Sequence, residues 1–156
     1  MVGSILGTKS IFSFFEKKFK KNIFFFDNLD VNLIKNYQKI KNLKNSCFIV
    51  ISKSGNTIET ISNFNIINNK KNNLFISEKS NNYLKKIANK LKCEILEHRN
   101  YIGGRYSVLS EVGMLPSILM GLKEEKFKNF DNLIKSPKFI DGLIDSVSST
   151  IFYVKN

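Results

Sequence analysis

Short, largely apolar runs recur along the chain and carry the first structural signal. Runs of this length without regular polar alternation are typical of strands buried on both faces of a parallel sheet. We therefore predict strands at four places. They are Ile23–Phe26, Phe48–Ile51, Leu74–Ile76 and Glu94–Leu96.

Between these runs, apolar residues repeat every three or four positions, which is the spacing of one helix face. The repeats are Ile11, Phe12, Phe15 and Phe19; Leu33, Ile34, Tyr37 and Ile40; Ile58, Ile61 and Phe64; and Tyr83, Leu84, Ile87 and Leu91. Asp30 is placed to cap the second of these helices. Helices that alternate with strands predict an α/β fold, a parallel, doubly wound sheet with helices on both faces.

The chain after Arg105 has no further strand signal. Helical patterns cover about 108–121, 125–135 and 137–154, and Pro137 suits the first turn of the last helix. We predict an α/β domain over residues 1–123, followed by a helical segment over 124–156.

The chain of 156 residues carries a formal net charge of +12, which raises the question of a nucleic-acid or membrane partner. Its lysines are scattered, however, and most fall on the polar side of the helical patterns. Solvated helix faces explain this distribution, and a general attraction for anionic substrates fits it as well. A basic nucleic-acid-binding domain remains an alternative without a motif, and we expect neither a nucleic-acid nor a membrane partner.

Two cysteines, Cys47 and Cys93, each open an apolar run and have no metal-like partner nearby in the sequence. We interpret them as reduced core thiols in a reducing compartment, and we expect a cytoplasmic protein without metal or cofactor.

A hydroxyl-rich loop follows the predicted strand Phe48–Ile51. It reads Ser52-Lys53-Ser54-Gly55-Asn56-Thr57 and leads into a predicted helix that starts at Thr57. A helix N-terminus favours a bound anion, hydroxyl groups can donate to phosphate oxygens, and glycine permits close approach or a positive φ. An ordinary helix cap and turn is the alternative interpretation.

Two other small-residue segments have the same character. Gly3-Ser4-Ile5-Leu6-Gly7 is predicted to be a turn before a helix, with a generic loop as the alternative. Gly103-Gly104-Arg105-Tyr106-Ser107 places an arginine after two glycines, where its fork of donors could hold an oxyanion or form a salt bridge at a helix end. His98 is the only histidine. A histidine can act as a general acid or base, but a structural role is the more common one.

Together, these three segments resemble the first sugar-isomerase (SIS) domain of the glucose-6-phosphate isomerase family. The resemblance rests on Gly3-Ser4-x-Leu6-Gly7, on Ser52 to Thr60, and on Gly103 to Ser110 with Val112-Gly113 and Leu115-Pro116. It implies a three-layer, flavodoxin-like SIS fold and the reversible conversion of glucose 6-phosphate to fructose 6-phosphate through an enediolate. It also implies a homodimer for the full-length protein.

The resemblance also assigns roles to single positions. It implies that the phosphate is held by Ser52, Ser54 and Thr57 with the backbone at Lys53, and that Arg105 stabilises the enediolate charge. The sugar pocket would be lined by Gly3, Ser4 and Gly104. Val2, Thr8 and Glu111 depart from the family pattern, which usually has glycine, proline and a small residue or proline at these places.

Two parts of the family pattern have no counterpart in this sequence. The family's first strand, central in the sheet, runs into the glycine–serine loop, whereas only Met1 and Val2 precede that loop here. The family's catalytic glutamate and histidine lie beyond Asn156, the glutamate in a second SIS domain, and His98 does not match the family's histidine position. We therefore expect a fragment that lacks its first strand and has little turnover by itself. A non-catalytic module that senses a sugar phosphate is the alternative function.

Overall fold

The computed structural model describes residues 5–19, 22–39, 46–67, 72–125, 127 and 131–155. It has two compact units, Met1–Leu122 and Lys123–Asn156. The first unit contains, in chain order, α1 (Ile5–Phe15), the 3-10 helix η1 (Glu16–Lys18), α2 (Val31–Gln38), β1 (Phe48–Ile51), α3 (Ile58–Ile67), β2 (Asn73–Ser77), α4 (Tyr83–Leu91), β3 (Glu94–Glu97), the 3-10 helix η3 (Gly104–Leu109) and α5 (Glu111–Met120). The second unit contains α6 (Asp131–Ile134) and α7 (Pro137–Lys155).

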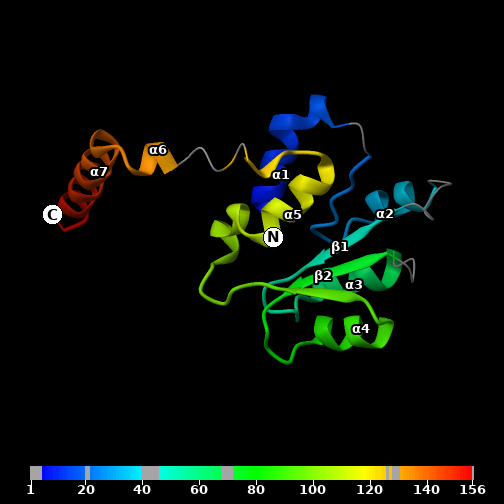
Figure 1. Cartoon of the computed structure of the whole chain (residues 1–156). Helices are drawn as coiled ribbons and strands as arrows, with labels where there is room; N and C mark the ends of the chain where they lie inside the picture. Colours follow the sequence, from blue (N-terminus) through cyan, green and yellow to red (C-terminus); the bar gives the residue numbers. More distant parts are fainter. Residues whose placement is uncertain are drawn as a thin grey trace. The chain divides into compact units, whose positions relative to one another are not determined.

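The strands form one parallel sheet in the order β1-β2-β3. Phe48 lies opposite Asn73 on β2, and Leu74 lies opposite Glu94 on β3. The predicted strands over 48–51, 74–76 and 94–96 are thus confirmed, as is the α/β class. Figure 1 shows α3 and α4 on one side of the sheet and α1 with α5 on the other.

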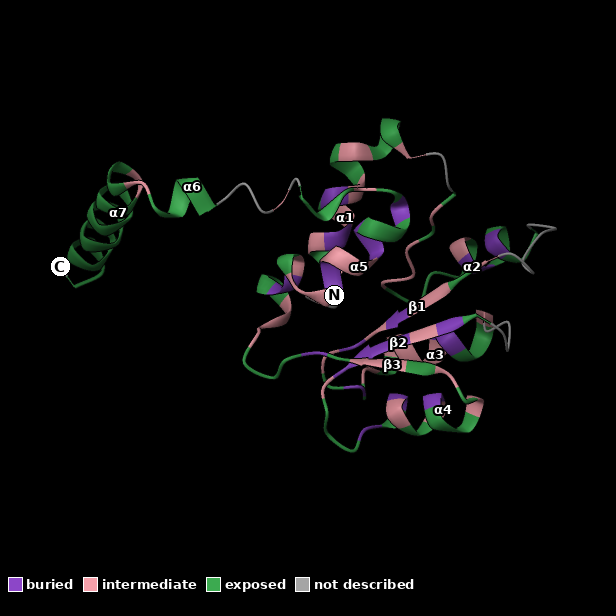
Figure 2. Ribbon diagram, in the orientation of Figure 1, coloured by how far each residue is buried: buried purple, intermediate pink, exposed green. Residues whose placement is uncertain are grey.

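The main hydrophobic core lies between the sheet and the pair α3 and α4. Phe75 on β2 is fully buried, and its ring meets that of Phe64 on α3 edge-on, with centroids 5.2 Å apart. Leu84 and Ala88 on α4 close the same cluster. Figure 2 shows buried stretches, in purple, on α3, α4 and β2. A ring pair of this geometry adds about 0.5–1.5 kcal/mol to the effect of burial alone.

The predicted strand at Ile23–Phe26 is wrong, because this segment forms no strand. It is held instead by Asn63 on α3, whose amide nitrogen donates to the carbonyl oxygens of Phe26 and Asn28. A strand requires a hydrogen-bonded neighbour, and the described residues include no strand between this segment and β1.

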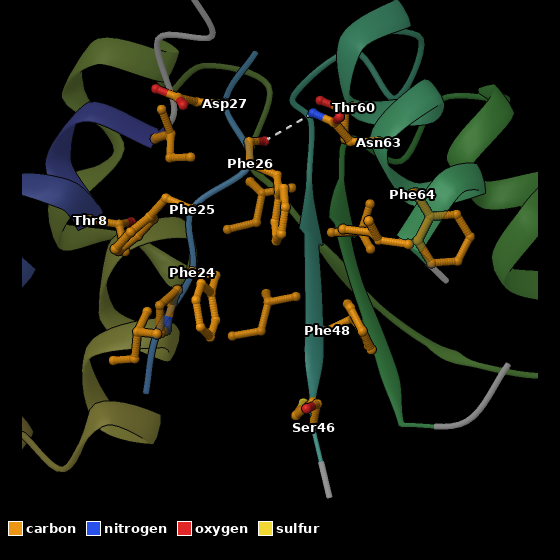
Figure 3. Close-up of a pocket in the computed structure, with 18 of the residues that line it drawn as sticks. Thr8, Phe24, Phe25, Phe26, Asp27, Ser46, Phe48, Thr60, Asn63 and Phe64 are labelled. Atoms are coloured by element: carbon orange, nitrogen blue, oxygen red, sulfur yellow. Dashed lines mark hydrogen bonds between the residues drawn. The ribbon is translucent and has the colours of Figure 1, made fainter. Parts of the chain in front are cut away.

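Among the described residues, no strand pairs with the outer edge of β1. The backbone N–H groups of Phe48 and Ser52 donate towards β2, so the alternation of a parallel ladder directs Ile49 and Ile51 away from it. A cavity of about 650 Å³ lies along this edge, and it is lined mainly by apolar residues. Figure 3 shows Phe24 and Phe26 on one side of it and Phe48 on the other.

On the far side of the cavity, α1, η3 and α5 pack against one another at two glycines. A Cβ atom on Gly7 would lie 2.6 Å from the Cβ of Val108, and one on Gly113 would lie 2.0 Å from the Val108 carbonyl oxygen. The hydroxyl of Thr8 also donates to the carbonyl oxygen of Val112, at 3.2 Å. A larger residue at either glycine would therefore have to displace η3.

Several predicted boundaries change. The helix expected at 108–121 is divided at Ser110, whose hydroxyl accepts from the N–H of Val112 and caps α5. The predicted helix 125–135 is α6, which begins only at Asp131, with residues 126 and 128–130 outside the described part. Asp30 caps α2 as predicted, since its carboxylate accepts from the N–H groups of Asn32 and Leu33.

The second unit carries its apolar residues on the surface of a helix. Ile140, Ile144, Val147 and Ile151 on α7 are all exposed. None of the described helices combines the length and hydrophobicity that a membrane crossing requires.

The two cysteines lie in different environments. Cys47 is exposed, so the expectation of a core thiol is wrong for this residue. Cys93 is half-buried and packs against the main core, as expected.

Candidate functional site

The carboxyl ends of the three parallel strands bring distant segments together at one edge of the sheet, where ligands bind in open α/β folds. The chain leaves β1 at Ser52, β2 at Glu78 and β3 at His98. The side chain of Lys53 joins all three exits. Its ammonium donates to the carbonyl oxygen of Asn100 at 2.9 Å and lies 3.5 Å from the Glu78 carboxylate.

The loop after β1 forms a compact turn into α3. Ser52 is fully buried, and its hydroxyl lies 2.7 Å from that of Thr57. The carbonyl oxygen of Thr57 accepts the first helical hydrogen bond, from Ile61. α3 therefore begins at Ile58, one residue later than predicted, and its first N–H groups are left without intrahelical partners. The positive end of the helix dipole favours an anion at this place.

Gly55 has the positive φ that the sequence allowed, at +66°. It also sits directly over Asn82, because a Cβ at this position would lie 2.1 Å from the side-chain Cγ of Asn82. The carbonyl oxygen of Gly55 accepts from Leu84 N–H, and the side-chain oxygen of Asn56 accepts from Tyr83 N–H. The start of α4 thus supports the loop.

Sequence reasoning missed the contribution of Asn82. This residue is buried, caps α4 and donates from its amide to the carbonyl oxygen of Glu78. Asn82 is the last residue of a polar run that is typical of a loop, and for this reason its structural role was not predicted. An asparagine directly before a helical repeat is nevertheless a capping signal, and that signal could have identified it.

The Gly103–Ser110 segment is organised by its own serines. The Ser107 hydroxyl donates to the carbonyl oxygen of Gly104, and the Ser110 hydroxyl donates to that of Ser107, both at 2.7 Å. Ser107 is buried, whereas Arg105 is exposed. Within the part of the chain that the structure describes, no carboxylate forms an ion pair with Arg105. Its guanidinium is therefore available to an anion, and the alternative of a helix-end salt bridge is not what the structure shows.

The structure thus brings three of the expected site residues together, and two others lie outside the described residues. Ser52, Ser54 and Thr57 share one turn, with Ser54 exposed and its hydroxyl accepting from Asn56 N–H. Gly3 and Ser4 lie outside the described residues. The segment after them is helical from Ile5 onwards, so the expected turn at Ile5–Gly7 is wrong. No group of three His, Cys, Asp or Glu side chains in the described segments could hold a metal ion.

Comparison with known proteins assigns the chain to a family. The family model for phosphoglucose isomerase matches residues 1–149. The chain belongs to the phosphoglucose isomerase family.

Among curated members of this family, the glucose-6-phosphate isomerase of Methanocaldococcus jannaschii is 32% identical, over 92% of this chain and 40% of that protein. The glucose-6-phosphate isomerase of Acholeplasma laidlawii is 35% identical, over 80% of this chain and 33% of that protein. The chain therefore spans well under half the length of the family members that it matches.

A solved structure shows the fold independently. The crystal structure of a hypothetical protein from Thermus thermophilus matches 88% of this chain with a TM-score of 0.75 and 19% identity, over 36% of that protein. At this identity, the likeness extends to the fold alone.

Proposed function

We propose that this chain provides the phosphate-binding and arginine-bearing part of an isomerase that interconverts glucose 6-phosphate and fructose 6-phosphate. The observation that supports it is the placement of the Ser52–Thr57 turn and the Arg105 segment after parallel strands of one sheet. Lys53 connects the two through the carbonyl oxygen of Asn100. Two relatives that share about a third of its residues are named glucose-6-phosphate isomerases.

In this proposal, the turn after β1 holds the substrate phosphate. Ser52, Ser54 and Thr57 provide its hydroxyl groups, and the N–H groups at the start of α3 supply the partial positive charge. Lys53 contributes its backbone, because its side chain is engaged with Asn100 and Glu78. Gly3, Ser4 and Gly104 would line the sugar.

Arg105 would act on the reacting atoms. A proton leaves C2 and one is returned to C1, while the hydroxyl and carbonyl oxygens exchange roles, so the reaction is redox-neutral overall. The enediolate between these steps carries an oxyanion, and a fixed cation beside it is a strong electrostatic contribution to rate.

The reaction also requires a general base within hydrogen-bond reach of the C2 proton. We propose that this base comes from a part of the protein outside residues 1–156, to which residues 124–156 lead, and that the present chain alone has little turnover. We further propose a cytoplasmic enzyme that works as a homodimer.

Phosphate binding by the chain itself is the first test. We expect millimolar fructose 6-phosphate to raise the thermal midpoint, since a ligand at 100 times its Kd stabilises by about 2.7 kcal/mol. Ser54→Ala should weaken binding by about tenfold or more, because hydrogen bonds to charged groups contribute about 1.5–3 kcal/mol. The matched control is Ser148→Ala, which changes an exposed serine on α7.

Catalysis is tested in the longest natural protein that contains this chain. Arg105→Ala should lower kcat by much more than it raises KM, as expected for an interaction made mainly in the transition state. Retention of full isomerase activity by Arg105→Ala would show that the proposed catalytic role is wrong. Loss of phosphate binding with unchanged kcat would point to a binding role only.

A further inference from the structure

A buried histidine that the proposed function leaves unused lies beside the arginine segment. His98 follows β3 directly and is only 1% exposed. Its backbone N–H donates to the carbonyl oxygen of Ser77 at 2.8 Å, which fixes its place at the carboxyl edge of the sheet. In a buried imidazole, each of the two ring nitrogens needs a hydrogen-bond partner.

Both nitrogens of His98 face acceptors. Nδ1 pairs with the Oε1 carboxylate oxygen of Glu111, and Nε2 lies 3.2 Å from the carbonyl oxygen of Ile102. A carbonyl oxygen can only accept, so Nε2 carries a proton and donates it to Ile102. Glu111 lies in the first turn of α5, where the helix dipole favours a negative group.

The two contacts enclose the segment that carries Arg105. Ile102 directly precedes Gly103-Gly104-Arg105, and Glu111 directly follows Ser110, the residue that ends the segment. One buried side chain is therefore bonded to both ends of the segment that carries the exposed Arg105. An arginine on an exposed 3-10 helix acts as a fixed cation only if its backbone is held in place by surrounding groups.

We propose that the His98–Glu111 pair is a positioning element for Arg105: it fixes both ends of the Gly103–Ser110 segment and so sets where the guanidinium meets the substrate. The inference rests on the proposed function and adds to it. His98 touches no reacting atom in this scheme and acts through the backbone. The hydrogen bond from Lys53 to Asn100 also restrains the stretch between His98 and Gly103, from the side of the Ser52–Thr57 turn.

The first experiment needs no catalysis. Amide hydrogen exchange in the chain itself should show faster exchange across residues 102–110 in His98→Leu than in the parent, with the Ser52–Thr57 turn unchanged. Because a change at the buried His98 could prevent folding, Glu111→Gln is measured alongside it, at a side chain that is 25% exposed. Unchanged exchange across 102–110 in both variants would overturn the proposal.

The second experiment measures kinetics in the longest natural protein that contains the chain. Both His98→Leu and Glu111→Gln should lower kcat by about 10- to 100-fold, since small misplacements of catalytic groups cost up to about 100-fold. KM for fructose 6-phosphate should change little, because the phosphate turn keeps its contacts. A loss of stability also lowers the apparent kcat at constant KM, because only folded enzyme turns over, so kcat is calculated per folded protein, measured by circular dichroism at the assay temperature. A loss of kcat that disappears after this correction would contradict the proposal.

Conservative and double variants complete the test. His98→Asn keeps a donor near the Nδ1 position and should recover part of the kcat lost in His98→Leu. The double variant His98→Leu with Glu111→Gln should lose no more than the worse single variant, because partners in one unit are not additive. Additive losses, or no recovery by asparagine, would contradict a shared positioning role.

Two controls separate the inference from the function on which it rests. Asp27→Asn removes another ion pair of the first unit, that with Lys9, and should leave kcat unchanged. Arg105→Ala is measured in the same assay. If Arg105→Ala abolishes turnover while His98→Leu and Glu111→Gln keep it, only the positioning inference fails; if Arg105→Ala retains turnover, the proposed function fails.

Discussion

The two sides of the β1–β2–β3 sheet differ in how completely they are filled. On the side of α3 and α4, Phe75, Phe64 and Leu84 form a closed cluster. Along the outer edge of β1, towards α1 and α5, a cavity of about 650 Å³ lies between the sheet and the Ile23–Phe26 segment. Both sides are rich in phenylalanine, so hydrophobicity alone does not account for the difference.

The difference lies in hydrogen bonding and shape. The backbone of β2 is paired on both edges, and this fixes Phe75 against the helices that cover it. Ile23–Phe26 has an equally apolar sequence but no strand beside it among the described residues, and Asn63 anchors its end through two hydrogen bonds. An apolar run becomes a core strand only where a neighbouring strand completes the ladder.

The largest expected contrast comes from removing one phenylalanine on each side. Phe75→Ala, in the closed core, should lower the free energy of unfolding by about 3–5 kcal/mol. Phe24→Ala should cost only about 1 kcal/mol, because this side chain is 40% exposed and already borders a cavity. Urea denaturation measures both values. Equal losses in the two variants would show that the two sides are packed alike.

A smaller effect is expected from cutting the link between the two sides. Asn63→Leu removes two hydrogen bonds to the backbone of the 22–28 segment and should cost about 1–3 kcal/mol. Asn65→Leu, at an exposed position of the same helix, is the matched control and should stay within about 0.5 kcal/mol of the parent. If the two variants unfold at the same urea concentration, Asn63 does not anchor the segment.

The smallest effect concerns alkaline pH at the cavity. Burial raises the pKa of Tyr37, which lines the cavity, above its ordinary value of 10.0. A group whose pKa is raised by folding stabilises the protein fully below the unfolded pKa, and this contribution is lost as pH rises through the folded pKa. Stability should therefore fall above about pH 10, and Tyr37→Phe should lose less over this range. If urea denaturation shows that both proteins lose the same free energy of unfolding over this pH range, Tyr37 does not contribute to the loss.

Local signals in the sequence were sufficient for much of the fold. The apolar runs located three of the strands, the helical spacing located α2, α3 and α4, and Asp30 was recognisable as a cap. The glycine and hydroxyl loops stand out as a candidate site from residue chemistry alone. These features depend on near neighbours in the chain, and for that reason they are readable without a structure.

Other features depend on contacts between distant residues. The failed strand at Ile23–Phe26, the Asn82 side chain beneath Gly55 and the two acceptors around His98 follow from which segments meet in space. The sequence by itself determined the residue types of the site and the alternation of helices with strands. Only the tertiary structure decided which apolar run is paired, which glycine is packed and which charges face each other, because burial and hydrogen bonding are settled by neighbours that lie far apart in the chain.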